Sequence, residues 1–582
     1  MPDSSVSIPD WPSQWMGSWQ SALNRWGRYI KLKEPRFIID SASDKQSGTP
    51  LAYIDLQAKQ VVVGCSAVER WALQDYAEEI FAHEIGHHVY APGDLNEAAR
   101  CMARMRRALR EYAAEAGIIL NMYTDLMINH RLKTRGLRID AIYRAMKGGP
   151  TDPLWDLYMR TYELLWGLPA GNLGTDNISE EMEADAAVAA QLIRSFANEV
   201  VRGSGMFASI CYYYLQKSGS AKSRDQMEPW ADSEGQFPDG MLPDGLTAMD
   251  AGEDEECIYP EFDETGKWVP PSQPSEESAG NSGGQTRLPN EYHAILESMG
   301  IRISPEEAAI RYYTERARPH LIPFPVAETI ESEEPLLEGY EIWQPGHPVE
   351  RINWFQSLLR STEVIPGYTT VQNRYGRSEG QDRGVIPVDL DLYVDCSGSM
   401  PNPAVSVSYP ALAGAIIALS ALRTGSRVQA TLWSGPGQYS ITDGFVRDQK
   451  KILGVLVGYF GGGTAFPLQI LRKTYLEDKP PKRKVHILVI SDDGVDTILQ
   501  NDELGNSGAD IAARSLDIAG GGGTFALQLY SDWQSNPRLK QTADMGFKIH
   551  SVNSADELTA FARRFVIENY AREGDRPGRS HT

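Results

Sequence analysis

The sequence predicts two folded halves, a mostly helical α+β domain at the N-terminus and a doubly wound α/β domain at the C-terminus. In the first half, short β-like runs precede long stretches with helical periodicity. Towards the C-terminus, strands alternate with helices, which is typical of a largely parallel sheet. The length of 582 residues also exceeds what a single hydrophobic core supports.

Composition narrows the classes of partner. A net charge of −22 argues against nucleic acid or an anionic membrane as the main partner.

No apolar run reaches the roughly eighteen residues that span a bilayer. The N-terminus lacks the basic start and apolar stretch of a secretory signal. Five scattered cysteines form no CxxC pair, which argues against a disulfide framework, so we expect a cytoplasmic, reduced protein.

The boundary between the halves is expected in an acidic stretch. Residues 221–285 carry 16 acidic and 3 basic residues and are rich in Gly, Pro and Ser. Such a segment buries little apolar surface, so it favours a disordered linker. The predicted organisation is therefore an N-terminal domain over 1–218, a linker over 219–289, a helix and extended segment over 290–384, and a C-terminal domain over 385–572.

The stretch FAHEIGHHVY, residues 81–90, carries the first candidate site. A helix is predicted over roughly 67–90, and on a helix positions i and i+4 share one face. His83 and His87 can therefore offer two imidazoles to one zinc ion, and Glu84 is the expected general base for peptide hydrolysis. An HExxH match is expected by chance about 0.01 times in a chain of this length.

A catalytic zinc needs a third protein ligand, and the sequence offers two candidates. In SEEMEADAAVAAQL, Glu181 and Asp185 are four residues apart on a predicted helix whose small residues allow close packing. In LNMYTDLMINHRL, Asn121, Asp125 and Asn129 follow one helical face.

These motifs resemble those of known metallopeptidases. HEIGHH followed by E-x-x-A-D is similar to the gluzincin pattern of ImmA/IrrE-type and HtpX-type peptidases, which have a zincin fold. That resemblance implies Glu181 as the third zinc ligand and Asp185 as a residue supporting a histidine. In a separate family, metallopeptidases fused to a von Willebrand A-like domain, HExxH is followed sooner by a D-x-x-x-N helix, which Asp125 and Asn129 match. Glu181 is the preferred ligand and Asp125 the alternative.

The C-terminal half carries the second candidate site. The strand VIPVDLDLYVD runs into Asp395, Ser397 and Ser399, and a later strand, KVHILVISDDG, reaches Asp492. In doubly wound sheets ligands bind at the carboxyl ends of the strands, where these residues fall. The glycine-rich loop YFGGGTAF adds Thr464. Carboxylate and hydroxyl oxygens suit Mg²⁺ or another hard divalent cation.

This set resembles the metal-ion-dependent adhesion site (MIDAS) of von Willebrand factor A domains, which have a Rossmann-like fold. The resemblance covers roughly residues 385–570. Asp395, Ser397 and Ser399 match the DxSxS motif, Thr464 the loop threonine and Asp492 the distal aspartate. It implies that a protein partner supplies a carboxylate to the bound cation.

The two sites together predict a zinc metallopeptidase that acts on a protein or peptide and recruits a partner or substrate through its C-terminal domain. Bacterial proteins of similar architecture work with MoxR-type AAA+ ATPases. This resemblance implies an ATPase on another chain, since no GxxxxGK[ST] motif is present. The alternative is a non-enzymatic adaptor, similar to the A-type subunits of metal chelatases, with a structural or vestigial zinc site.

Overall fold

The structure is a computed structural model that divides into two compact units, Met1–Ala308 and Ala309–Thr582. Among the residues it describes, no helix is long and apolar enough to cross a membrane. The described residues are 11–38, 50–55, 58–146, 152–218, 242–271, 286–321, 333–379, 387–529, 532–552 and 554–570.

The first unit contains a three-stranded sheet with the order β1-β3-β2. Strand β3 (Gln60–Gly64) lies in the middle, parallel to β1 (Lys33–Ile38) and antiparallel to β2 (Ala52–Asp55). Three residues of β3 are valines, which suit a strand buried on both faces. In this order β2 is at the edge of the sheet, as far as the described residues go, and it contacts the helix that carries the histidines.

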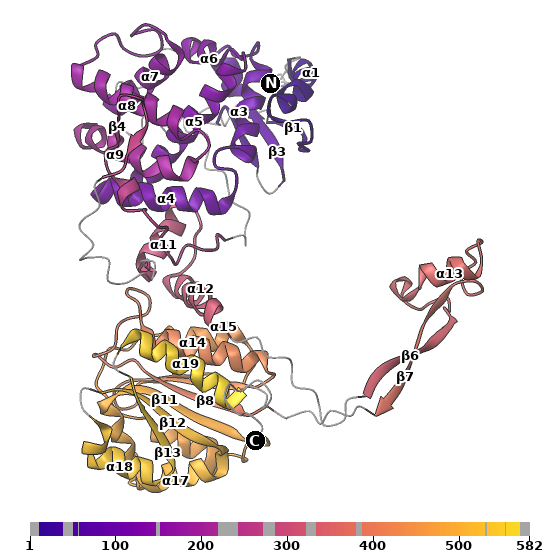
Figure 1. The fold of residues 1–582 in the computed structure, drawn as a ribbon, viewed down its shortest axis with the longest axis vertical. Coiled ribbons are helices and arrows are strands. Elements are labelled where there is room, and N and C mark those ends of the chain that lie inside the picture. The colour runs from indigo at the N-terminus through magenta and orange to yellow at the C-terminus, as the bar shows by residue number, and fades with distance from the viewer. Residues whose placement is uncertain are drawn as a thin grey trace, which may run out of the picture. The chain divides into compact units, whose positions relative to one another are not determined.

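Helices make up most of this unit (Figure 1). Helix α5 is buried on all of its faces, which is typical of a helix at the centre of a helical unit. It contacts α3, α4, α7 and α9. The helices are α1 (Trp11–Trp26), α2 (Cys65–Arg70), α3 (Ala77–Val89), α4 (Leu95–Leu109), α5 (Ala116–Thr134), α6 (Ile139–Ala145), α7 (Pro153–Trp166), α8 (Glu180–Ser195), α9 (Val200–Ser218), α11 (Pro289–Ser298) and α12 (Pro305–Ala317), which crosses the division between units.

The helix predicted over 67–90 is interrupted. Helix α2 ends at Arg70, and Ala72 adopts a left-handed backbone conformation with φ of 53°. This turn lets the Leu73 side chain enter the core, where it is fully buried. The chain then begins α3 at Ala77, so the histidine helix is shorter than predicted and starts only six residues before His83.

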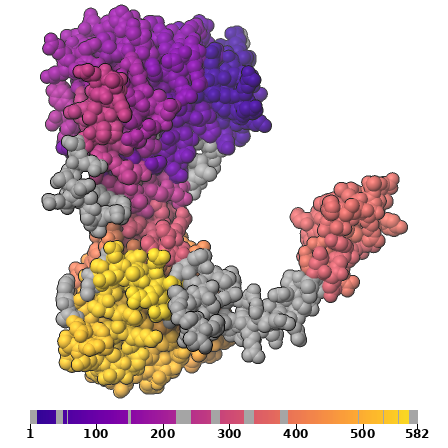
Figure 2. Space-filling view, in the orientation of Figure 1, coloured from indigo at the N-terminus to yellow at the C-terminus, as the bar shows by residue number. Residues whose placement is uncertain are grey.

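Part of the predicted linker is folded onto the first unit. Residues 242–271 include the 3-10 helix η3 (Glu255–Cys257) and the hairpin of β4 (Glu261–Phe262) and β5 (Trp268–Val269), and η3 packs against α4 and α9. Figure 2 shows this acidic segment on the surface of the helical unit. The linker prediction is therefore wrong for 242–271, whereas 219–241 and 272–285 lie outside the described residues.

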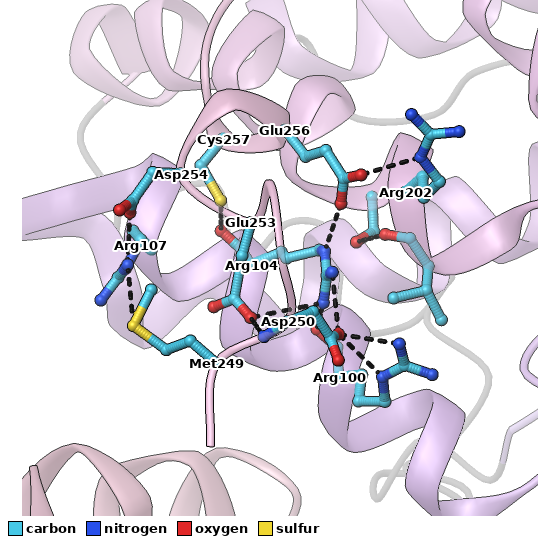
Figure 3. Close-up of polar contacts among 12 residues, drawn as sticks. Arg100, Arg104, Arg107, Arg202, Met249, Asp250, Glu253, Asp254, Glu256 and Cys257 are labelled. Atoms are coloured by element: carbon cyan, nitrogen blue, oxygen red, sulfur yellow. Dashed lines mark hydrogen bonds and ion pairs between the residues drawn. The ribbon is translucent and has the colours of Figure 1, made fainter. Parts of the chain in front are cut away.

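Ion pairs with arginines explain why the acidic segment folds (Figure 3). The guanidinium of Arg104, on α4, lies 2.8 Å from Asp250 and 2.9 Å from Glu256. Glu253 is fully buried and forms two hydrogen bonds, of 2.6 and 2.7 Å, with Arg287. Buried charges are stable only when they are paired, so the acidic residues and the arginines require one another.

Replacing Glu253 by alanine should therefore lower the free energy of unfolding of the first unit by about 3 kcal/mol, because two buried guanidinium groups lose a partner. Urea unfolding of the full chain measures this loss. Asp254→Ala is the matched control, because the Asp254 side chain is 58% exposed and its ion pair with Arg107 lies in water. It should cost less than about 1 kcal/mol. Equal losses in the two variants would contradict the role given to burial.

The second unit has the predicted α/β fold, with a six-stranded sheet of order β10-β9-β8-β11-β12-β13. All neighbours are parallel except β10, which is antiparallel to β9. If these six strands are numbered 1 to 6 from β8 to β13 along the chain, their order in the sheet is 3-2-1-4-5-6, as in doubly wound domains. In such domains the ligand crevice lies where the order reverses, which is here between β8 and β11. The strands are β8 (Asp389–Asp395), β9 (Val428–Trp433), β10 (Tyr439–Ile441), β11 (Val485–Asp492), β12 (Gly520–Gln528) and β13 (Phe547–Ser551).

Helices cover both faces of this sheet. Helix α14 packs against α19 and β8, and α17 packs against β11 and β12, so that the sheet lies between the two groups (Figure 1). A separate two-stranded antiparallel sheet, β6 (Glu333–Ile342) with β7 (Val371–Glu379), precedes the six-stranded sheet in the chain. The segment that connects these two strands contains α13 (Trp354–Arg360). The remaining helices are α14 (Tyr409–Arg423), α15 (Gln449–Leu456), α16 (Leu468–Leu471), α17 (Gly508–Ala519), α18 (Pro537–Asp544) and α19 (Ala555–Tyr570).

One carboxyl group in the core of the second unit makes its stability depend on pH. Asp391 on β8 is fully buried, and burial raises its pKa to about 7, although hydrogen bonds from Tyr475, Gln429 and Tyr393 oppose the rise. The folded state keeps this proton between pH 3.8 and about 7, whereas the unfolded state loses it. The unit therefore loses stability as the pH rises through this window, by about 1.4 kcal/mol per pH unit.

Asp391→Asn should remove this dependence. The free energy of unfolding of the variant, relative to the wild type, should rise between pH 4 and pH 7 by about 4 kcal/mol. Urea unfolding at several pH values measures the difference. A difference that stays constant with pH would contradict the assignment of the titration to Asp391.

Candidate metal sites in the two units

Helix α3 presents His83 and His87 on one face, one turn apart. Their imidazole rings are nearly perpendicular, at 86°, with centroids 4.9 Å apart. The two Nε2 atoms lie 3.3 Å from each other. Aromatic packing anchors the helix, because Phe81 contacts the rings of Trp15 and Trp19 on α1. The i, i+4 spacing thus brings two imidazole nitrogens together, as the sequence predicts.

Asp125, on the central helix α5, completes this group. Its Oδ1 atom lies 3.3 Å from Nε2 of His87 and 3.6 Å from Nε2 of His83. The Oδ1 atom is buried and has no hydrogen-bond partner among the described residues. The ligand atoms of these three side chains all lie within 4.8 Å of one another, close enough to hold one metal ion. A buried carboxylate oxygen facing two imidazole nitrogens is the arrangement that a cation would stabilise.

Gly86 allows the two helices to approach. A Cβ atom at this position would lie 2.6 Å from Cγ2 of Ile128 on α5 and 2.8 Å from the indole of Trp26. Neither distance is compatible with a real side chain in the present packing. Glycine in the HEIGHH motif is therefore what lets α5 lie close enough for Asp125 to reach the histidines.

Glu84 lies beside these candidate ligands, which is where a general base would be needed. It is 2% exposed and lines the same cavity as His83 and Asp125. The cavity has a volume of about 80 Å³. The apolar residues that line the cavity are Leu51, Ile80, Ile139, Ile142, Met146 and Trp155.

The structure does not bring Glu181 to the histidines, so the preference for it as third ligand is corrected. Its side chain is 73% exposed on the first turn of α8, and its carboxylate lies 3.9 Å from Nζ of Lys217. Asp185 does not support a histidine either. Its two oxygens accept hydrogen bonds from Tyr214 and from Tyr259 of the acidic segment, at 2.7 and 2.6 Å. Asp185 instead connects α8 to α9 and to the acidic segment.

Helix α7 supplies polar groups that the sequence did not single out. Asn129, one turn after Asp125 on α5, accepts through Oδ1 a hydrogen bond of 2.8 Å from Nδ1 of His83. Behind it lie the hydroxyl groups of Tyr158 and Tyr162. In the sequence WDLYMRTYELLW, the i, i+4 spacing of these two tyrosines is the signal that could have pointed to them.

The second site lies at the carboxyl ends of β8 and β11. The Oγ atoms of Ser397 and Ser399 are 3.1 Å apart, and Ser399 donates a hydrogen bond of 2.7 Å to Asp492. Asp395 accepts hydrogen bonds from the Ser397 amide, at 2.7 Å, and from the Ser491 hydroxyl, at 2.6 Å. Ser491 is a further residue that the sequence did not single out.

The loop carrying Thr464 folds over this group. The amide of Gly398 donates to the carbonyl of Gly462, at 2.9 Å, and Thr464 packs against Gly494, two residues beyond Asp492. Burial raises the pKa of Asp395, and the negative charge of Asp492 raises it further. A cation at this edge of the sheet would offset both effects. Asp395, Ser397, Ser399 and Asp492 thus lie together at the crevice of the sheet, and Thr464 contacts the chain just after Asp492.

Comparisons with known proteins add little to this picture. No family model and no curated protein matches the chain. The pilus adhesin SpaC from Lactobacillus rhamnosus GG is 19% identical over 32% of this chain and 31% of its own, with a TM-score of 0.23. A conserved hypothetical protein, BatB from Bacteroides thetaiotaomicron, is 13% identical over 31% of this chain and 97% of its own, with a TM-score of 0.20. The chain thus matches about a third of the adhesin's length.

Proposed function

We propose that the protein is a zinc-dependent peptidase whose second unit recruits a partner. The observation that carries the proposal is the triangle of His83, His87 and Asp125, with sides of 3.3, 3.3 and 3.6 Å. Ligand bonds of about 2.0–2.1 Å in a tetrahedral zinc site place neighbouring ligand atoms about 3.3 Å apart. The three side chains therefore fit zinc, and such a three-ligand set is typical of catalytic sites.

Zinc bound at this position would supply a Lewis acid that activates water and polarises a peptide carbonyl. Glu84 is the group in the cavity that accepts the proton from the attacking water and delivers it to the leaving nitrogen. Its burial beside the ligands excludes bulk water from this transfer. These roles correspond to a gluzincin-like reaction with an aspartate, and not a glutamate, as third ligand.

The substrate is proposed to bind in extended form along β2. This strand is at the edge of its sheet, so its outer backbone groups can pair with a peptide. Leu51, just before β2, lines the cavity that holds Glu84. The apolar wall of the cavity, including Ile142 and Trp155, favours an apolar side chain next to the cleaved bond.

The second unit is proposed to hold Mg²⁺ as von Willebrand A domains do, with ligands from Asp395, Ser397, Ser399, Thr464 and Asp492. The convergence of these side chains at the crevice of the sheet supports this proposal. A partner carboxylate would complete the coordination. A MoxR-type AAA+ ATPase is the proposed partner.

Peptide cleavage by the purified full chain tests the proposed function. We expect the protein to contain stoichiometric zinc and to cut a diverse peptide mixture with an apolar preference beside the cut, as mass spectrometry of the products shows. Chelation should remove this activity, and added zinc should restore it. Bound zinc with no cleavage of any peptide or unfolded protein would favour the adaptor function instead.

A further inference from the structure

A chain of hydrogen bonds through α7 connects two of the three candidate ligands. It runs from Nδ1 of His83 to Oδ1 of Asn129, over 2.8 Å, and from Nδ2 of Asn129 to the hydroxyl of Tyr162, also over 2.8 Å. It continues from Tyr162 to the hydroxyl of Tyr158, over 3.0 Å, and from there to Oδ2 of Asp125, over 3.3 Å. We refer to these five residues as the relay.

The donors and acceptors of the relay leave one consistent direction. The amide nitrogen of Asn129 lies 2.8 Å from Tyr162 and 3.1 Å from Tyr143, and each hydroxyl oxygen can accept one of its two hydrogens. The amide oxygen of Asn129 then faces His83, which must donate from Nδ1. A neutral imidazole that donates from Nδ1 keeps the lone pair of Nε2 for a metal.

The other end of the relay acts on Asp125. Tyr158 donates to Oδ2 of this carboxylate, whereas Oδ1 faces the two histidines and has no hydrogen-bond partner among the described residues. One oxygen is therefore engaged and the other is left for the ion. This division favours a carboxylate that binds through a single oxygen, which keeps the coordination number low.

We propose that the relay is a positioning device that selects the metal. It fixes the tautomer of His83 and restricts Asp125 to one ligand oxygen, so the site accepts four-coordinate ions such as zinc in preference to ions that need more ligands. The inference rests on the proposed zinc site but not on peptide cleavage. Tyr158 and Tyr162 are positioning residues, because neither is itself a ligand.

Burial explains why the hydroxyl groups are directed to one another. Tyr162 is fully buried and Tyr158 is 4% exposed, so each hydroxyl needs a partner within the protein. A tyrosine that serves packing alone can use a backbone carbonyl, as Tyr123 on α5 does with Val200 at 2.9 Å. The relay tyrosines instead bond to Asp125 and to Asn129, the residue that holds His83. Such a buried network of hydrogen bonds is stiffer than isolated bonds.

Tyr162→Phe tests the proposal, because it breaks the relay at its middle without touching a ligand. Tyr158→Phe breaks it next to Asp125. Tyr123→Phe is the matched control, since it removes an equally buried hydroxyl from the helix that carries Asp125. Each full-length variant is stripped of metal, its thermal unfolding is recorded, and zinc and cadmium affinities are measured by competition with a chromophoric chelator.

We expect both relay variants to bind zinc about 10–100-fold more weakly than the wild type and to lose zinc-over-cadmium preference, while Tyr123→Phe keeps both. With cobalt(II) in place of zinc, Tyr158→Phe should show weaker visible absorption bands, because Asp125 is then free to bind through both oxygens.

Unchanged zinc affinity and an unchanged cobalt spectrum in the relay variants would overturn the inference, whatever their stability. An equal loss of affinity in Tyr123→Phe would also overturn it, because the effect would then be a general one of stability. Wild-type protein that binds no zinc would overturn the proposed function itself. The zinc affinity of the wild type is therefore measured first, which separates this outcome from a failure of the relay alone.

Discussion

Replacing Glu84 by glutamine should leave zinc bound and lower kcat/KM for a cleaved peptide by about 10²–10⁴-fold. Glutamine has nearly the same shape and can keep hydrogen bonds in the cavity, where Glu84 is 2% exposed. It cannot accept the proton of the attacking water. The loss should therefore appear in kcat, because the group acts on the reacting atoms and not on the remote parts of the substrate.

The control for this variant is Glu78→Gln on the same helix. Glu78 lies in the first turn of α3 and forms an ion pair with Arg25, away from the cavity. This variant should keep full activity. If Glu84→Gln retains zinc and still cleaves at the wild-type rate, Glu84 is not the base, and the peptidase mechanism proposed above does not hold.

Loss of zinc should follow from Asp125→Ala and not from Glu181→Ala. Asp125 supplies one corner of the ligand triangle, and without it two imidazoles remain, too few for a catalytic zinc site. Glu181 is exposed and paired with Lys217, so its removal should change neither zinc content nor activity. Metal content of the purified proteins, measured by mass spectrometry, separates the two candidates.

A second variant keeps this test independent of folding. Asp125→Asn conserves the size of the side chain and its contact with Tyr158 but removes the negative charge, so it should weaken zinc binding while the metal-free protein unfolds at nearly the wild-type temperature. Full zinc content in Asp125→Ala, or zinc loss in Glu181→Ala, would contradict the structure at this site.

The motif residues of the first site could be predicted, whereas the candidate third ligand could be narrowed to Glu181 or Asp125 but not chosen. His83, Glu84 and His87 belong to one helix, so their spacing alone places them together. The third ligand depends on which other helix packs on α3, and sequence spacing gives no direct measure of that. The small residues of α8 favoured Glu181, whereas the decisive small residue is Gly86 on α3 itself, where Ile128 of α5 makes contact.

The second site was easier to predict because strand order places its residues. Asp395 and Asp492 end two neighbouring parallel strands, so the fold class alone brings them to one edge. The acidic segment was the opposite case. Its composition indicated disorder, yet Asp250 and Glu256 meet arginines about 150 positions earlier in the chain, and no local window of sequence contains both partners.

Those distant ion pairs also determine when the first unit can finish folding during synthesis. Arg104 on α4 emerges from the ribosome long before Glu256, 152 residues later, and Glu253 must wait for Arg287. Until then the arginine positions cannot be buried without uncompensated charge. A fragment that ends after α9, at Ser218, would remain in that incomplete state, so a self-standing N-terminal fragment must extend through α11 to Ser298.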